Sequence, residues 1–311
     1  MTSDRASLLP SLPQANPPTW LGVMGGGQLG RMFVHAAQAM GFKVAVLEPA
    51  HDCPAGQAAD HLLVADYTDA EALAELAAQC VAVSTEFENV PASSLASLAQ
   101  QVFVAPSAHC VSIAQDRLAE KEFFTRCAPQ SGVMPAPHRR IASQADIDVL
   151  PDDLLPGIVK TVRMGYDGKG QYVLRQSADV ATAWQQLGGV PLLLEGFVHF
   201  QREISLIGVR SRRGETAFYP VAENVHRGGI LRLSRSWPND PAAASARAYL
   251  DRLLDRLDYV GVLALELFQV GDQLLANEMA PRVHNTGHWT IEGAVTSQFE
   301  NHLRAVLGLP L

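Results

Sequence analysis

The sequence predicts an α/β part with a parallel sheet, followed by an α+β part. Short apolar runs recur in the first part, with helical stretches rich in Ala and Leu between several of them: 20–24, 43–47, 62–64, 81–83 and 102–104. Such alternation is typical of βαβ units, whose strands pair in parallel. A proline-rich connector at 129–137 then leads into short strands and hairpin-like pairs. We therefore expect the parallel sheet to end near Pro106 and a different architecture to follow.

Each remaining element is predicted from its own pattern. The first apolar run ends in a glycine loop at 25–30, and a helix is expected to follow it through Met40. Further elements are expected in the second part, namely helices at 116–126, 241–257 and 297–307 and strands at 262–270 and 273–279.

Composition excludes several classes of protein. At 311 residues the chain is long enough for two or three domains with substantial cores. Hydrophobic residues make up 48% and charged residues 18%, as in an ordinary soluble globular protein. The net charge of −8, without a long run of Lys or Arg, argues against binding to nucleic acids or membrane surfaces. No apolar run is long enough to predict a transmembrane helix.

The cysteines and the N-terminus bear on the location of the protein. Cys53, Cys80, Cys110 and Cys127 form no C-x-x-C pair, which favours reduced thiols and a cytoplasmic setting. Residues 1–19 are rich in proline and lack the continuous apolar stretch of a signal peptide. We expect them to form a disordered N-terminal tail.

Gly25, Gly27 and Gly30 form a G-x-G-x-x-G loop between the first strand and the first helix. Glu48 ends the next strand, where a dinucleotide-binding fold places its ribose acceptor. The glycines would let the backbone approach a phosphate at the helix N-terminus, whichever molecule carries that phosphate. A tight turn without a ligand is the alternative, so this loop alone does not identify a ligand.

A second polar cluster, 84–91, follows the fourth apolar run and contains Glu86 and Glu88. Ligands of open α/β sheets bind beyond the carboxyl ends of the strands. Both acids are therefore candidate acceptors for ribose hydroxyls. A solvated loop is the alternative interpretation.

Two features predict a site for nucleotide phosphates. Lys160 ends an apolar strand, and a buried ammonium needs an anion, which a phosphate would provide. A lysine satisfied within the core is the alternative. The loop 164–171 follows, with three glycines that could close over a phosphate chain and with Lys169 as a charge. Its spacing differs from that of the G-x-x-x-x-G-K-[ST] loop.

Residues 192–198 form an apolar strand that leads into a linker, and Glu203 follows five positions later. A linker backbone can hydrogen-bond an adenine edge, and an acid beyond it can hold ribose hydroxyls. From spacing alone, this assignment is only a hypothesis.

The most informative segment is 277–289, which combines a carboxylate, a guanidinium, two imidazoles and two amides. It follows an apolar strand whose lone acid is Glu266, and Glu278 lies twelve positions later. Two acids at this spacing fit a strand pair that faces one pocket. Mg²⁺ prefers such oxygen ligands and keeps waters and substrate phosphates in its other positions. A structural ion-pair network is the alternative, but charges rarely interrupt apolar strands without a partner.

Together these motifs resemble the N5-carboxyaminoimidazole ribonucleotide synthetase family of the ATP-grasp superfamily, the ATPase subunit of phosphoribosylaminoimidazole carboxylase. The resemblance runs from Leu21 to Leu311. The motifs that resemble the family are GGGQLGRM at 25–32, TEFENV at 85–90, GYDGKGQ at 165–171 and NEMAPRVHNTGHWT at 277–290. The last two motifs in combination are highly specific.

The resemblance implies an ATP-dependent carbon–nitrogen ligase of de novo purine biosynthesis. ATP would phosphorylate bicarbonate, and the amine of 5-aminoimidazole ribonucleotide would take up the activated carboxyl group. ATP and Mg²⁺, with Mn²⁺ as a possible substitute, are the implied cofactors, and a homodimer is the implied assembly. No nucleophilic side chain is needed, because positioning and charge neutralisation carry phosphoryl transfer.

The resemblance also assigns roles by position. ATP would be held by Arg117, Lys160, Gly165, Tyr166, Asp167, Gly168, Lys169, Gly170, Gln171, Glu195, Gly196, Phe197, Val198, Glu203, His226, Asn277 and Glu278. Mg²⁺ would be held by Glu266 and Glu278. The catalytic residues around bicarbonate or carboxyphosphate would be Arg282, His284, Asn285 and Lys160. The ribonucleotide would be lined by Gly27, Gln28, Leu29, Glu86, Glu88 and Tyr166. For His226 a purely structural role is the alternative.

The implied architecture is an ATP-grasp fold preceded by a Rossmann-like domain with a parallel sheet. We expect that first domain, which would bind the ribonucleotide, at 20–106, and the ATP-grasp domain at 107–311, with a small lid subdomain at about 130–197 and a large subdomain at about 198–311. The family's usual C-terminal β-rich domain, which reaches the ribonucleotide phosphate, is expected to be missing. Met164 departs from the family, which usually has a glycine there.

Two other functions stay open at this point. A non-catalytic or partner-dependent nucleotide-binding protein would follow from loss of the C-terminal domain, although the retained acids and Lys160 argue against it. An NAD-dependent oxidoreductase would follow from the first glycine loop, although Gln28 and the downstream acids disfavour it.

Overall fold

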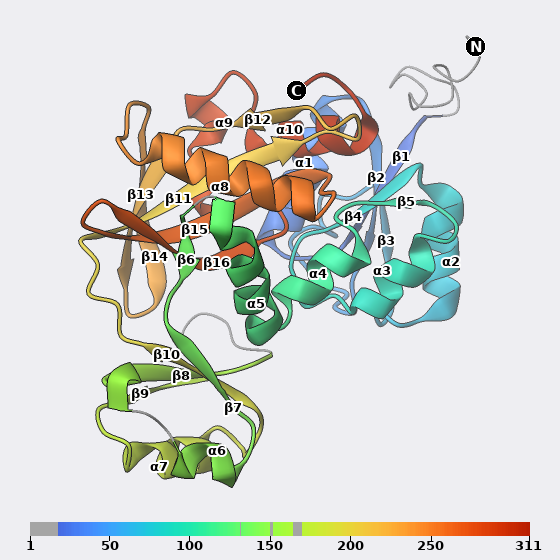
Figure 1. Ribbon diagram of the computed structural model, residues 1–311. Coiled ribbons are helices and arrows are strands. Elements are labelled where there is room, and N and C mark those ends of the chain that lie inside the picture. The colour runs from blue at the N-terminus through green and yellow to red at the C-terminus, as the bar shows by residue number, and fades with distance from the viewer. Residues whose placement is uncertain (1–17, 131, 150–151, 164–169) are drawn as a thin grey trace.

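The computed structural model describes residues 18–130, 132–149, 152–163 and 170–311. The described strands form three sheets (Figure 1): a parallel sheet of five strands, a small sheet of four and a large sheet of seven. The small sheet forms a separate lobe at the bottom of Figure 1. The predicted succession of a parallel sheet and an α+β part is confirmed.

The first sheet has the strand order β3-β2-β1-β4-β5 and is parallel throughout. Its strands are β1 (Trp20–Met24), β2 (Lys43–Leu47), β3 (His61–Leu63), β4 (Ala82–Thr85) and β5 (Phe103–Val104). All of them overlap the predicted apolar runs. Strands β1 and β2 are almost wholly buried because helices cover both faces of the sheet.

The helices around this sheet divide between its two faces. One core contains apolar residues of α1 (Gln28–Ala39) and α10 (Gln298–Leu307), and the other contains those of α2 (Ala70–Gln79) and α3 (Ala92–Leu98). Helix α4 (Ala108–Ala114) then connects this part to the rest of the chain.

The small sheet is antiparallel and has the order β7-β10-β8-β9. Its strands are β7 (His138–Ile141), β8 (Gly157–Thr161), β9 (Gln171–Leu174) and β10 (Leu192–Gly196). Helices α6 (Gln144–Asp148) and α7 (Asp179–Gln186) and a 3-10 turn (Asp152–Leu154) contribute to its core. Because β10 extends to Gly196, the predicted linker begins later than expected, and Glu195 lies in the strand.

The large sheet has the order β14-β13-β11-β15-β16-β6, with β12 paired to β11. Its strands are β6 (Met134–Pro135), β11 (Arg202–Arg210), β12 (Thr216–Phe218), β13 (Val221–Arg227), β14 (Ile230–Trp237), β15 (Gly261–Val270) and β16 (Gln273–Ala280). All pairs are antiparallel except that of β16 with β6. Helices α5 (Arg117–Cys127) and α8 (Ala243–Arg256) share one core with this sheet. Short elements complete the chain: 3-10 turns at Ala128–Gln130 and Asn285–Gly287, and helix α9 at Thr290–Gly293.

Helix α10 packs against both the parallel sheet and the large sheet. Leu303 and Val306 belong to the core of the first, whereas Phe299 and Ala305 belong to a core with β11 and β15. The helix ends at Gly308, whose φ of +69° lies in the left-handed region that favours glycine. Its packing fixes the two sheets against each other. None of the described helices is long and apolar enough to span a membrane.

Candidate active site

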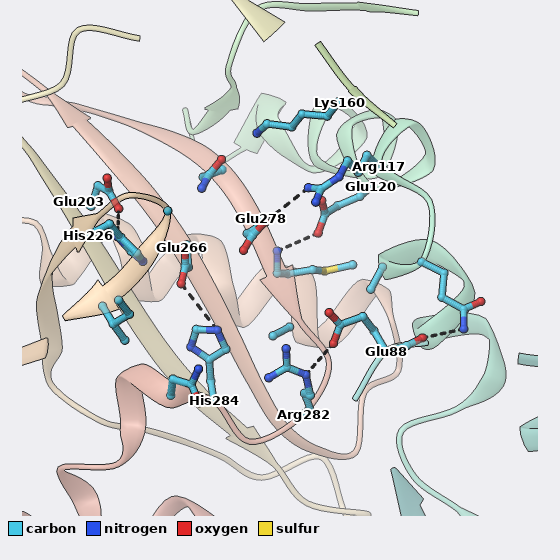
Figure 2. Close-up of a pocket in the computed structure, with 18 of the residues that line it drawn as sticks. Glu88, Arg117, Glu120, Lys160, Glu203, His226, Glu266, Glu278, Arg282 and His284 are labelled. Carbon is cyan, nitrogen blue, oxygen red and sulfur yellow. Dashed lines mark hydrogen bonds and ion pairs between the residues drawn. The ribbon is translucent and has the colours of Figure 1, made fainter. Parts of the chain in front are cut away.

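A cavity of about 530 Å³ lies where the three sheets meet. Its walls come from the loop after β4, from α5, from β8 and β9 of the small sheet, and from five strands of the large sheet. The structure brings together many predicted site residues there: Glu88, Arg117, Lys160, Gln171, Glu203, His226, Glu266, Asn277, Glu278, Arg282, His284 and Asn285. Figure 2 shows ten of the lining residues with labels.

Glu266 and Glu278 are register partners on β15 and β16, and both line the cavity. The expectation that their spacing places them on a strand pair facing one pocket is met; their role as metal ligands stays a prediction. Burial, together with the nearby charge of Glu278, raises the pKa of Glu266 to about 8. Within the described part of the chain, Glu266 pairs with His284, whose Nε2 lies 3.6 Å from Oε1.

The first turns of α5 approach the same pair of acids. Asp116 caps this helix by accepting hydrogen bonds from the amides of Leu118 and Ala119. Arg117, the first residue of the helix, places Nη1 3.6 Å from Oε2 of Glu278 (Figure 2). Glu120, one turn later, accepts a hydrogen bond of 2.8 Å from the amide of Met279, and burial raises its pKa to about 8.

Lys160 is paired with a carboxylate of the protein itself. Its Nζ contacts Oε2 of Glu195 on the neighbouring strand β10, and Nζ of Lys121 lies 2.6 Å from the other oxygen, Oε1. Burial alone would raise the pKa of Glu195, but the two ammonium groups outweigh burial and lower it to about 2. The anion that the sequence required for Lys160 is therefore present in the fold. Glu195 faces these lysines instead of belonging to an open linker.

Glu203 and His226 form a second pair inside the cavity. Oε2 of Glu203 on β11 lies 2.5 Å from Nδ1 of His226 on β13 (Figure 2). The carboxylate of Glu203, which accepts from the imidazole, is the main cause that raises the pKa of His226. In such a pair the charged imidazole can donate to one ribose oxygen, and the second carboxylate oxygen can accept from another ribose hydroxyl. His226 is thus not an isolated core histidine.

Arg282 connects the large sheet to the loop after β4. Its Nε donates a hydrogen bond of 2.7 Å to Oε2 of Glu88, and its Nη1 donates to the carbonyl of Val283 at 3.1 Å. The side-chain amide of Gln115 donates to the backbone carbonyls of Glu88 and Val90, both at 2.6 Å, and thereby holds this loop.

His284 is a buried, neutral imidazole. Burial and the neighbouring Arg282 lower its pKa to about 3. Its Nδ1 accepts from the amide of Thr286, which places the ring proton on Nε2, the nitrogen that faces Glu266. The side chain of Gln298 makes two hydrogen bonds to the backbone of His284, accepting from its amide at 2.9 Å and donating to its carbonyl at 2.6 Å.

The first glycine loop carries a carboxylate where a phosphate was expected. Oε1 of Glu86 accepts from the amide of Gly27, and Oε2 accepts from the amide of Gly30 at 2.5 Å. Glu86 therefore occupies the N-terminus of α1, and the expectation that a ligand phosphate binds to these amides does not fit the structure. Glu48 is also engaged, since it accepts from the amide of Gly26 at 2.8 Å and from Tyr67.

The other predicted residues divide into two groups. Gln28 and Leu29 begin α1, Gly196 ends β10, and Phe197 and Val198 follow it. Gly170 precedes β9, which starts at Gln171. The loop residues predicted to bind ATP or the ribonucleotide lie outside the described residues: Gly165, Tyr166, Asp167, Gly168 and Lys169, as does Met164.

The sequence motifs did not point to Gln115 and Glu120, which line the cavity, or to Lys121, which contacts Glu195 beside it. Lys121 lies four positions after Arg117 on the same helix, so helical spacing could have placed both on one face. Nothing in the local pattern could have indicated the partner of Lys121, because Glu195 is 74 positions away and lies on a strand of the small sheet.

The fold and the cavity define a class of enzyme. A family model described as the ATP-grasp domain matches residues 127–299, and one described as the ribonucleotide synthetase preATP-grasp domain matches residues 19–115. The chain therefore has an ATP-grasp domain behind the type of domain that precedes it in ribonucleotide synthetases.

Individual relatives narrow this class to one family. An N5-carboxyaminoimidazole ribonucleotide synthase from Pseudomonas aeruginosa is 52% identical over 292 residues, which are 94% of this chain and 80% of the relative. The crystal structure of the Thermus thermophilus synthetase, at 47% identity, superposes with a TM-score of 0.84 over 94% of this chain and 79% of that one. An Aspergillus clavatus structure in complex with ADP and 5-aminoimidazole ribonucleotide, at 31% identity, gives 0.84 over 94% and 77%. The chain belongs to the N5-carboxyaminoimidazole ribonucleotide synthase family.

Proposed function

We propose that the protein carboxylates 5-aminoimidazole ribonucleotide with ATP and bicarbonate, through carboxyphosphate, in de novo purine biosynthesis. A bicarbonate oxygen attacks the γ-phosphorus of ATP, and ADP leaves. The amine nitrogen of the ribonucleotide then bonds to the carboxyl carbon, phosphate leaves, and the amine loses a proton. The product is N5-carboxyaminoimidazole ribonucleotide.

One observation supports this proposal above the others: a single cavity joins an acid pair to a guanidinium and a neutral imidazole. Glu266 and Glu278 lie on paired strands, while Arg282 and His284 follow β16 directly. Such a cavity can hold a polyphosphate next to a small anion, which is what the transfer of a phosphoryl group to bicarbonate requires.

The acid pair fits a divalent cation. Glu266 is buried beside the carboxylate of Glu278. Its neighbour His284 is neutral, so His284 supplies no positive charge to balance these two acids. We propose that Glu266 and Glu278 hold Mg²⁺, or Mn²⁺ in its place. No group of three or more His, Cys, Asp or Glu side chains in the described part of the chain could hold a metal, so substrate phosphates and waters would complete the shell. When bound, the cation neutralises phosphate charge.

The other site residues would each bind one part of the substrates. Arg117, Lys160 and Asn277 would hold the phosphates of ATP, while Glu203 and His226 would hold its ribose. Arg282 offers fixed N–H donors to carboxyphosphate, because Glu88 and the carbonyl of Val283 orient its guanidinium. His284 offers an N–H from Nε2 without a positive charge, and Asn285 lines the cavity next to it.

The ribonucleotide would bind on the side of the first domain, 20–106. Glu88 and Asn89, on the loop after β4, line the cavity on this side. Glu86 would act there with Gly27, Gln28 and Leu29, its carboxylate already fixed on the helix amides.

We assign the lid role to the small sheet, 130–197, and place the large subdomain at 198–311. The four cysteines are buried and form no C-x-x-C pair, which supports a reducing, cytoplasmic setting.

The proposal is tested by measuring ADP release in the presence and absence of bicarbonate and of 5-aminoimidazole ribonucleotide. ADP formation that depends on bicarbonate and yields a carboxylated ribonucleotide is the expected result. ATP binding without either dependence would support the non-catalytic nucleotide-binding protein instead. The oxidoreductase is disfavoured because Glu86 occupies the amides that a dinucleotide pyrophosphate would need.

A further inference from the structure

Lys121 is a buried lysine that binds two parts of the protein at once. Only 2% of its surface is exposed. Its Nζ lies 2.6 Å from Oε1 of Glu195 on β10 and donates a hydrogen bond of 2.7 Å to the carbonyl of Asn277 on β16. It therefore connects α5 with the small sheet and with the strand that carries Glu278.

Glu195 is shared between two ammonium groups. Its second oxygen contacts Nζ of Lys160, which lies on the adjacent strand and lines the cavity. Two lysines around one carboxylate leave a net charge of +1 in this cluster. The cluster can thus attract an anion, which an isolated pair of Lys160 and Glu195 could not do to the same extent.

The second lysine decides whether Lys160 can change partner. If Glu195 had Lys160 alone, movement of that ammonium to a phosphate would leave a buried carboxylate unpaired, a change that is strongly unfavourable. With Lys121 in place, Glu195 keeps a counter-ion and a hydrogen bond. Lys160 can then turn from the carboxylate to a ligand in the cavity.

We propose that Lys121 is a positioning residue, which neutralises Glu195 and so leaves Lys160 free to bind the phosphates of ATP. The proposal rests on the proposed function, because it takes ATP as the ligand of the cavity. Lys121 itself does not reach the ligand; it acts through Glu195 and Lys160.

The test compares Lys121→Met with the double variant Lys121→Met/Glu195→Gln in the full chain. In the single variant Glu195 depends on Lys160 alone, so we expect the KM for ATP and the Kd for ADP to rise about tenfold, with kcat within about threefold. In the double variant the carboxylate of Glu195 no longer competes for Lys160. We expect its KM and Kd to return to within about threefold of wild type. ADP binding is measured by calorimetry, and turnover by ADP release.

The return of KM and Kd in the double variant separates this role from a structural one. The double variant removes more native contacts than the single variant, so a purely structural role would make it bind ADP no better. Lys43→Met is the matched control, since it breaks an ion pair with Asp60 at 2.5 Å in the first domain and should leave both constants unchanged. If Lys121→Met does not fold, Lys121→Gln replaces it, because glutamine keeps hydrogen-bond donors and removes only the charge.

Wild-type ADP affinity in the single variant would overturn the proposal, and so would a double variant that binds ADP no better than the single one. Failure of the proposed function gives another result: ADP release by the wild-type chain would not depend on bicarbonate. The comparison of ADP affinities would still decide the role of Lys121.

Discussion

Nε of Arg282 donates a hydrogen bond of 2.7 Å to Oε2 of Glu88. Arg282 follows the last strand of the large sheet, whereas Glu88 follows the fourth strand of the parallel sheet, 194 positions earlier in the chain. The pair therefore joins the proposed ribonucleotide side of the cavity to the proposed carboxyphosphate side. It also fixes the plane of the guanidinium, so that the remaining N–H groups have a defined direction.

We predict that Arg282→Lys lowers kcat by about a hundredfold or more. A lysine ammonium cannot both bind Glu88 and donate to carboxyphosphate with the geometry of the guanidinium. The measurement is the rate of ADP release at saturating ATP and bicarbonate. Arg304→Lys is the control, since Arg304 pairs with Glu300 and donates to the carbonyl of Pro310, and is not among the residues that line the cavity. A kcat for Arg282→Lys close to that of the control would contradict the role of the guanidinium.

Glu278→Gln should lower ATP turnover by more than about tenfold, because only Glu266 would remain to hold a divalent cation against the phosphates. ADP formation is followed over a Mg²⁺ titration, which also shows whether excess cation restores part of the rate. Glu292→Gln, at an exposed position of α9, serves as the control. Rates near wild type at ordinary Mg²⁺ would show that Glu278 is no ligand.

The sequence predicted the fold well where a pattern is local. Strands β1, β2, β15 and β16 and helices α5, α8 and α10 all lie where their apolar patterns placed them. Burial on both faces makes the strands of the parallel sheet continuous apolar runs, which are easily recognised. The pair Glu266 and Glu278 was predictable for the same reason, since each is an acid in an apolar strand.

The partners of charged groups were less predictable. Lys160 and Glu195 were predicted to bind ATP, but their contact with each other across adjacent antiparallel strands was not predicted, and Lys160 also lines the cavity. The contacts of Glu86 with the amides of Gly27 and Gly30 were not predicted either, and its role toward the ribonucleotide stays a prediction. Such pairs depend on which strands become neighbours, and apolar periodicity does not determine that.

Nicotinamide cofactors should not bind to the first glycine loop. A pyrophosphate there would have to displace the carboxylate of Glu86 from the amides of Gly27 and Gly30, and would face its negative charge. Calorimetry with NAD and NADP at millimolar concentration should show no heat of binding, while ADP in the same buffer should bind. Tight binding of either dinucleotide would revive the oxidoreductase interpretation.

Acid should destabilise the protein through His302. This buried imidazole accepts from the amide of Val262 at 3.1 Å on Nδ1, so its proton lies on Nε2, which is 2.8 Å from Oγ of Ser84. It thereby joins α10 and β15 to the end of the parallel sheet. Burial lowers the pKa of His302 to about 4, from an ordinary value of about 6.5.

Because protonation is easier in the unfolded chain, the stability that the neutral ring contributes is complete above about pH 6.5 and is lost as the pH falls toward 4. Between pH 7 and pH 4.5 the wild type should lose roughly 2–3 kcal/mol more free energy of unfolding than His302→Gln does. Denaturant unfolding at both pH values measures this difference. His109→Gln, at an exposed position of α4, should behave like the wild type. If His302→Gln loses as much stability as the wild type over this range, His302 is not the group that senses acid.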